Sequence, residues 1–146
     1  MAPTHVNESR ILQGEAATEA LGAELAALTP PGGTWLLQGG LGAGKTTFTR
    51  GFVAGLGGDP DQVASPTYAV LHRYACPGGS VHHLDLYRLG EAGAWSLGLE
   101  ETVRPGDWLV VEWAGVAGPW PTEWVARLIL EGDGEERLAR WSRPIS

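Results

Sequence analysis

The stretch Gly39–Thr47, GGLGAGKTT, combines closely spaced glycines with the only lysine of the 146-residue chain. The spacing Gly-x-x-x-x-Gly-Lys-Thr is typical of a loop that surrounds phosphate groups with backbone N–H groups and leads directly into a helix. In such a loop the lysine ammonium contacts the phosphates and the threonine hydroxyl contacts Mg²⁺. The residues predicted to bind a nucleotide here are Gly40, Leu41, Gly42, Ala43, Gly44, Lys45, Thr46 and Thr47.

The choice of lysine at position 45 is informative because every other basic residue in the chain is arginine. A compact ammonium fits inside the loop as a point charge, whereas the arginine fork suits bidentate contacts. Guanine-specific proteins of this type usually read the base with an Asn/Thr-Lys-x-Asp motif, which needs a second lysine. We therefore expect ATP. An incidental lysine in a glycine-rich turn is the alternative, and the predicted strand before and helix after the loop disfavour it.

Two acidic residues lie in apolar runs that are predicted to be buried strands. Glu112 follows Leu109-Val110-Val111, and Asp85 lies within His83-Leu84-Asp85-Leu86. Phosphate-transfer sites need an acid at the end of a neighbouring strand to hold Mg²⁺ or orient the attacking water, and an unpaired buried acid is costly. We predict that both act in catalysis and at the metal. Which one contacts Mg²⁺ directly stays open, as does a structural ion pair of Asp85 with Arg88.

Residues Ser65-Pro66-Thr67-Tyr68 lie between the predicted loop helix and the next strand. Proline disfavours helical backbone at the residue before it, which keeps this segment extended. In switch proteins this connection senses the terminal phosphate. We predict that Ser65 binds the nucleotide and that Thr67 has a catalytic role, with an ordinary polar turn as the alternative.

The elements that must position these residues follow from hydrophobic periodicity. A buried strand leads into the glycine loop, and Phe48, Phe52, Val53 and Leu56 share one face of the helix after it. We expect one α/β domain over residues 1–146, with a P-loop NTPase-like, mixed and mainly parallel sheet flanked by helices. Strands are predicted over 5–12, 34–38, 67–74, 81–86, 107–111, 124–131 and 136–141, helices over 15–28 and 45–56, and a short helical stretch near 91–99.

Composition limits the classes of function. The net charge of −7 and the absence of a basic stripe argue against a protein that grips RNA by itself. The single cysteine, Cys76, forms no intrachain disulfide and suits a reducing compartment. The first ten residues do not have the pattern of a signal peptide, and no stretch is long and apolar enough for a membrane span. We expect a cytoplasmic protein without membrane contact.

Four motifs together, GGLGAGKTTFTRGF, SPTY, HHLDLYRL and VVEW, resemble the TsaE family (formerly YjeE) in order and spacing. The likeness covers about residues 15 to 115. This family consists of small bacterial P-loop ATPases of the tRNA threonylcarbamoyladenosine pathway. Many members carry Asp or another polar residue where this chain has Gly40, and the link near 115–121 is shorter here.

The resemblance implies an ATPase that is weak alone and works in a complex with TsaD and TsaB homologues, contacting tRNA only indirectly. It implies that Lys45 contacts phosphates, that Thr46 and Glu112 hold Mg²⁺, and that Asp85 supports the metal or its water. It also implies that residues 65–67 form a switch and that Arg137, in the C-terminal hairpin, reaches the nucleotide.

Other signals carry less weight. His82 and His83 suggest a metal site, but adjacent strand residues point to opposite faces. Trp108, Trp113, Trp120 and Trp124 are expected to pack in the core or at the surface, with a partner-docking patch as the alternative. Two rival functions are a small P-loop kinase, for which few residues remain to build an acceptor pocket, and a non-catalytic nucleotide-gated binding module.

Overall fold

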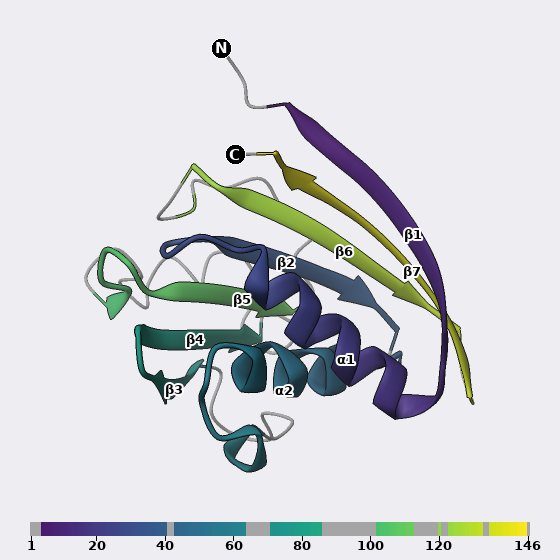
Figure 1. The fold of residues 1–146 in the computed structure, drawn as a ribbon, viewed down its shortest axis with the longest axis horizontal. Helices are drawn as coiled ribbons and strands as arrows, with labels where there is room; N and C mark the ends of the chain where they lie inside the picture. Colours follow the sequence, from purple (N-terminus) through teal and green to yellow (C-terminus); the bar gives the residue numbers. More distant parts are fainter. Residues whose placement is uncertain are drawn as a thin grey trace.

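The computed structural model describes residues 4–40, 43–63, 71–85, 102–112, 120, 123–132 and 135–145, in which a curved sheet carries two helices on one face (Figure 1). The helices are α1 (Gly14–Ala27) and α2 (Lys45–Gly55), and a 3-10 turn, η1, spans Pro60–Gln62. The strands are β1 (His5–Gln13), β2 (Thr34–Gly39), β3 (Leu71–Cys76), β4 (Gly79–Asp85), β5 (Trp108–Glu112), β6 (Val125–Glu131) and β7 (Glu136–Pro144).

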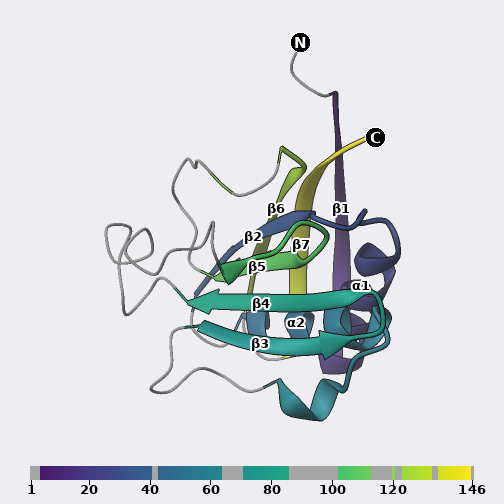
Figure 2. The same cartoon turned by 90° about the vertical axis from the view of Figure 1, so that its left-hand side faces the viewer.

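The strands are ordered β1-β7-β6-β2-β5-β4-β3 across the sheet. The four central strands β6, β2, β5 and β4 are parallel, and β7 and β3 are antiparallel to their neighbours. β1 is antiparallel to β7 and therefore points the same way as the central strands. Figure 2 shows the opposed arrows of β3 and β4 beside the matching directions of β4 and β5. The prediction of a mixed, mainly parallel sheet is confirmed.

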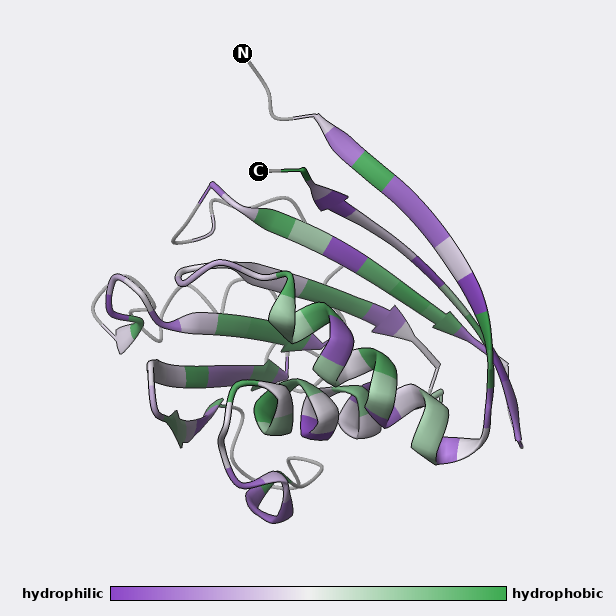
Figure 3. Cartoon of the chain, in the orientation of Figure 1, coloured by the Kyte–Doolittle hydropathy of each residue, from purple (hydrophilic) through white to green (hydrophobic). Residues whose placement is uncertain are grey.

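Burial explains why the parallel strands occupy the centre. Every residue of β5 is buried, and β4 is buried from Ser80 to Asp85, as strands covered on both faces must be. The outer strand β1 is mostly exposed, and Figure 3 shows it as largely hydrophilic, in contrast to the more hydrophobic central strands β2 and β5. The alternating burial of β6 places Ala126, Leu128 and Leu130 toward the helices.

The two helices hold the sheet from one side. Leu21 and Leu25 of α1 and Phe48 and Phe52 of α2 pack with Trp35 of β2 in the larger core. Trp35 Nε1 also donates to Thr29 Oγ1 at 2.8 Å, and Thr29 Oγ1 donates to the carbonyl oxygen of Leu25 at 2.7 Å. These bonds tie the end of α1 to the start of β2. A smaller core on the other face contains Leu36, Leu84, Val103, Leu109 and Val111.

Glycines let α1 and α2 approach until their backbones touch. A Cβ added to Gly51 would lie 1.9 Å from the carbonyl oxygen of Glu19, and one added to Gly22 would lie 2.2 Å from that of Phe48. Backbone atoms cannot move aside as a flexible side chain can. The contact therefore fixes the position of α2, and with it the loop that precedes this helix.

We predict that Gly51→Ala lowers the free energy of unfolding by about 1–3 kcal/mol, because the added methyl forces the two helices apart. Chemical denaturation followed by far-UV circular dichroism measures this change. Gly40→Ala is the matched control, since nothing lies within 4 Å of a Cβ built there. Equal stability of the two variants would show that α2 shifts without cost and would contradict the close-contact account.

Most predicted elements are present, and several of them begin or end at other residues than predicted. The predicted helix over 15–28 ends at Ala27, and Leu28 is 48% exposed because it lies beyond the last helical turn. The connection between the predicted strands 67–74 and 81–86 is shorter than those bounds imply, because Cys76 pairs with Gly79 and leaves only Pro77 and Gly78 between the strands. The predicted helical stretch near 91–99 and residues 67–70 of one predicted strand lie outside the described residues.

The tryptophans follow the expected packing. Trp108 is buried in the larger core, Trp124 packs edge-on against Trp35 with ring centroids 6.0 Å apart, and Trp120 contacts the smaller core. Trp113 lies outside the described residues. Within the described part of the chain, no helix has the length and hydropathy needed to cross a membrane.

Candidate functional site

The candidate site lies where the central parallel strands end. β2 leads into the glycine loop, and α2 returns across the sheet from that loop (Figure 1). Leu37 of β2 is in register with Glu112 of β5, and Glu112 is in register with Asp85 of β4. Lys45, Glu112 and Asp85, predicted from separate motifs, are thereby brought to one edge of the sheet. The carboxyl edge of parallel strands is where α/β proteins bind ligands.

Lys45 is buried at the first position of α2 and points back over the loop. Its Nζ donates to the carbonyl oxygens of Gly39 at 2.6 Å and Gly40 at 3.1 Å. Burial lowers the pKa of the ammonium, and the negative charges of Glu112 and Asp85 act in the opposite direction. The ammonium is therefore close enough to both carboxylates to feel their charge and is already partly stripped of water.

Two backbone features are described in the glycine loop. Gly44 has a φ of 107°, a left-handed conformation that favours glycine. The N–H of Ala43 donates to the carbonyl oxygen of Gly40 at 3.1 Å, which closes the described part of the loop. Thr46 and Thr47 lie half-buried in the first turn of α2, where backbone N–H groups have no partner within the helix. Leu41 and Gly42 lie outside the described residues.

Glu112 and Asp85 are both buried, at 4% and 7% exposure, although each ends a strand. Their side chains share the helix-facing side of the sheet with Lys45. Each acid therefore approaches the loop from a neighbouring strand, with β5 directly beside β2 and β4 one strand further away. This arrangement predicts a shorter path from Glu112 than from Asp85 to a metal bound at the loop.

The prediction that His82 and His83 point to opposite faces is confirmed. His82 Nε2 lies 2.8 Å from Asp107 Oδ2, while His83 Nε2 is hydrogen-bonded to Glu112 Oε2. Burial alone would raise the pKa of Asp107, but hydrogen bonds from His82 and from the N–H groups of Ser80 and Arg104 lower it. The contact of His83 with Glu112 was missed by the sequence reasoning, although the spacing His83-x-Asp85 on one strand already placed both on one face.

Arg137 reaches the loop from β7. Its Nε donates to the carbonyl oxygen of Ala43 at 3.1 Å. The side chain of Arg137 thus lies beside the glycine loop, and its contact with a nucleotide stays a prediction. The hydrogen bond joins residues 94 positions apart in the chain, so no local pattern could have revealed it.

The residues present fit a nucleotide with Mg²⁺. Among the described residues no group of three or more His, Cys, Asp and Glu side chains is placed to enclose a metal. Mg²⁺ usually keeps several waters and binds through one or two carboxylates plus substrate phosphates, so a hydroxyl and two acids are a suitable donor set. The open space around Gly40, where an added Cβ meets nothing within 4 Å, leaves room for a ligand.

Several predicted residues lie outside the described ranges. These include the switch segment with Ser65 and Thr67, the candidate ion-pair partner Arg88 and the two loop positions 41 and 42. The roles predicted for them remain predictions.

Comparison with known proteins identifies relatives. Residues 12–139 match the family model for "Threonylcarbamoyl adenosine biosynthesis protein TsaE". The "tRNA threonylcarbamoyladenosine biosynthesis protein TsaE" of Bacillus subtilis is 37% identical over 121 residues, covering 82% of this chain and 75% of the relative. The protein of the same name from Rickettsia bellii is 35% identical over 112 residues, covering 76% of this chain and 77% of the relative.

A solved structure shares the fold. The crystal structure of Bacillus subtilis YdiB aligns with a TM-score of 0.73 at 26% identity, over 97% of this chain and 88% of that chain. This match confirms the predicted P-loop NTPase-like α/β fold.

Proposed function

Because the chain belongs to the TsaE family, which is named for tRNA threonylcarbamoyladenosine biosynthesis, we propose that it is the ATP-hydrolysing component of that synthesis complex. The observation that carries this proposal is the meeting of Lys45, Glu112 and Asp85 at the carboxyl edge of the sheet. A phosphate-binding loop beside two buried acids supplies the charges that phosphoryl transfer to water needs. Residues 1–146 act as one ATPase domain in this proposal.

Each residue has a defined task in this proposal. Lys45 leaves the carbonyls of Gly39 and Gly40 and neutralises charge on the β- and γ-phosphates, while backbone N–H groups over residues 40–47 hold phosphate oxygens. Thr46 and Glu112 would hold Mg²⁺, which would neutralise charge at the phosphates. Asp85 orients the attacking water or the metal's own waters. Arg137 supports the loop from β7 and reaches toward the nucleotide.

The switch segment completes the site in this proposal. Ser65 contacts the nucleotide and Thr67 acts on the γ-phosphate side, so that their positions differ before and after hydrolysis. The lack of a second lysine for guanine recognition supports ATP as the nucleotide.

The partners follow from the family and from charge. We place the protein in the cytoplasm with homologues of TsaD and TsaB, where its hydrolysis resets or activates the transferase. A net charge of −7 disfavours direct tRNA binding, so tRNA is contacted through the partners. Release of phosphate from ATP by the purified protein, dependent on Mg²⁺, tests the enzymatic part of the proposal. Absence of turnover both alone and with the partners would contradict it.

We predict that Glu112→Gln raises the Mg²⁺ concentration for half-maximal ATP turnover by about tenfold. Asp85→Asn should raise this concentration less. The reason is that β5 lies beside β2 whereas β4 lies one strand away. Removing a carboxylate from a metal site typically costs at least as much as the 10- to 100-fold effect of disturbing its supporting residues. Steady-state turnover across a Mg²⁺ titration gives the comparison.

Asp107→Asn is the matched control for these two variants. Asp107 precedes β5 and pairs with His82 on the other face, so its loss should change stability but not the Mg²⁺ requirement. A higher Mg²⁺ requirement in the Asp85 variant alone would reverse the two assigned roles.

A further inference from the structure

We propose that His83, held by Tyr74, is a positioning residue that fixes the carboxylate of Glu112 for its role at the Mg²⁺–nucleotide site. This inference rests on the function proposed above. Its basis is a continuous hydrogen-bonded chain, Tyr74–His83–Glu112, which runs from β3 through β4 to β5 beside the loop.

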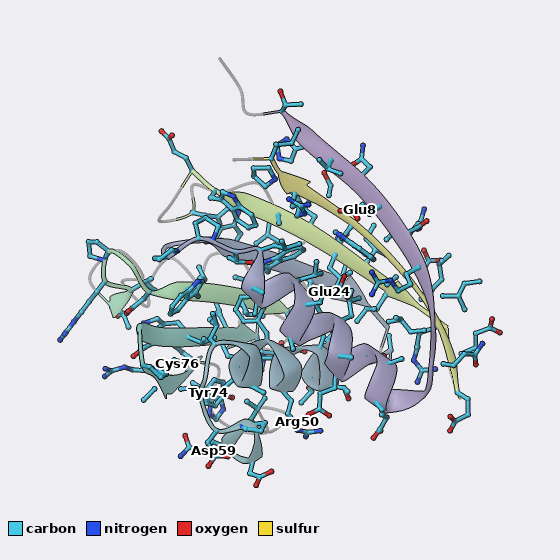
Figure 4. The ribbon with its side chains drawn as sticks, in the orientation of Figure 1. Glu8, Glu24, Arg50, Asp59, Tyr74 and Cys76 are labelled. Carbon is cyan, nitrogen blue, oxygen red and sulfur yellow. The ribbon has the colours of Figure 1, made fainter. Side chains whose placement is uncertain are left out.

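The chain of hydrogen bonds is fully buried at its centre. His83 has no exposed surface, and its Nε2 is hydrogen-bonded to Oε2 of Glu112. Its other ring nitrogen, Nδ1, lies 3.2 Å from the hydroxyl of Tyr74. Tyr74 lies on the β3–β4 side of the molecule (Figure 4), and His72 stacks parallel to its ring at a centroid distance of 6.2 Å. The histidine therefore cannot rotate without breaking contacts at both ends.

The acceptors along the chain determine the tautomer of His83. An ionised carboxylate only accepts hydrogen bonds, so Nε2 of His83 must carry the proton that faces Glu112. In a neutral ring Nδ1 is then an acceptor, and the hydroxyl of Tyr74 donates to it. The hydrogen bond from Tyr74 to Nδ1 therefore favours the tautomer of His83 in which Nε2 carries the proton and donates it to Glu112.

This arrangement engages one oxygen of the Glu112 carboxylate and leaves the other for a metal. Oε2 of Glu112 is engaged by His83, and no hydrogen bond to Oε1 occurs among the described residues. An anchored carboxylate with one oxygen committed presents the other in a fixed direction. Residues that hold a metal ligand in this way usually contribute 10- to 100-fold to metal affinity or activity.

The structure also contains a built-in comparison. His82 of β4 and Asp107, the residue just before β5, form a second buried histidine–carboxylate pair, but on the other face of the sheet and at the opposite end of β5. Loss of either pair should affect stability. Only loss of the His83 pair should affect the use of Mg²⁺.

The test uses four variants of the full chain. His83→Leu has similar bulk but no hydrogen bond, His83→Gln places an amide donor near the former Nε2, and Tyr74→Phe removes only the hydroxyl. His82→Leu is the matched control. Two readouts are required: the Mg²⁺ concentration for half-maximal ATP turnover, and the affinity for a fluorescent non-hydrolysed ATP analogue with Mg²⁺ and with EDTA.

We expect His83→Leu to raise the half-saturating Mg²⁺ concentration about tenfold and to reduce the Mg²⁺-dependent gain in analogue affinity similarly. His83→Gln should stay within about threefold of the wild type, and Tyr74→Phe should fall between these two. Affinity in EDTA should be unchanged in all four variants, because none of them alters Lys45 or the glycine loop. His82→Leu should lower the unfolding temperature without changing the Mg²⁺ requirement.

Three results would overturn the proposal: a wild-type Mg²⁺ requirement in His83→Leu, an equal defect in His83→Gln and His83→Leu, or the same shift in His82→Leu. If His83→Leu fails to fold, Tyr74→Phe decides, and an unchanged Mg²⁺ requirement in that variant counts against the proposal. If the wild-type protein itself shows no Mg²⁺-dependent ATP binding, the proposed ATPase function fails.

Discussion

Lys45→Ala is expected to weaken ATP binding by about 10- to 150-fold, the range set by losing about 1.5–3 kcal/mol of hydrogen bonding to a charged group. Lys45→Arg should lose nearly as much although it keeps the charge. The ammonium occupies a site that is 5% exposed and lies within 3.1 Å of two loop carbonyls. A planar guanidinium is wider than an ammonium and cannot enter that space without displacing the loop. Equilibrium binding of ATP by fluorescence or calorimetry measures both variants.

Arg50→Lys is the control for a change of cation on the same helix. Arg50 is half-buried on α2 and projects outward from that helix in Figure 4. ATP affinity in this variant should equal that of the wild type. If Lys45→Arg binds ATP within about threefold of the wild type, a difference of roughly 0.7 kcal/mol, head-group shape does not explain the single lysine.

The Lys45 ammonium is hydrogen-bonded to the loop backbone in the structure. With its Nζ bound to Gly39 and Gly40, the ammonium replaces part of its lost hydration with backbone carbonyls. Phosphate oxygens carry full charges and compete well for the same donor. In the proposed function, phosphate binding therefore exchanges these two carbonyl acceptors for charged ones.

The parts of the fold that follow from local sequence were predictable. The apolar run before the glycine loop and the helical spacing of Phe48, Phe52 and Val53 identified β2 and α2, because side-chain periodicity directly reflects burial. The alternation in β6 and β7 identified the closing hairpin in the same way. The ends of helices and strands were harder to predict from local sequence. Nothing in the residues around Leu28 shows that α1 ends at Ala27, one residue before the predicted end.

The missed part of the site depends on strand order, which no single segment contains. Glu112 and His83 belong to strands separated by more than twenty residues, and their contact requires that β4 and β5 be parallel neighbours in one particular register. A shift of one residue would move His83 to the opposite face. The resemblance to a known family supplied Arg137, but not the support of Glu112 by His83 and Tyr74.

Addition of both TsaD and TsaB homologues is expected to raise ATP turnover by at least about 100-fold over the protein alone. In related phosphoryl-transfer systems, an arginine or an ordered switch supplied by a partner raises the turnover rate by a factor of about 10³–10⁵. The expected increase of about 100-fold is therefore a conservative estimate. Among the described arginines, Arg73 donates to Ser80 Oγ at 3.0 Å and Arg104 is exposed before β5, so neither is committed to the loop. A partner that contacts residues 65–67 would complete the proposed site.

The measurement is ATP turnover by the protein alone, with tRNA alone, with each partner and with both. The net charge of −7 predicts that tRNA alone has no effect, because repulsion from the phosphate backbone opposes a direct complex. Stimulation by tRNA without partners would contradict partner gating and point to an RNA-binding surface on this chain. Lys45→Ala with both partners is the control, since partner contacts cannot restore turnover when ATP is not held in the loop.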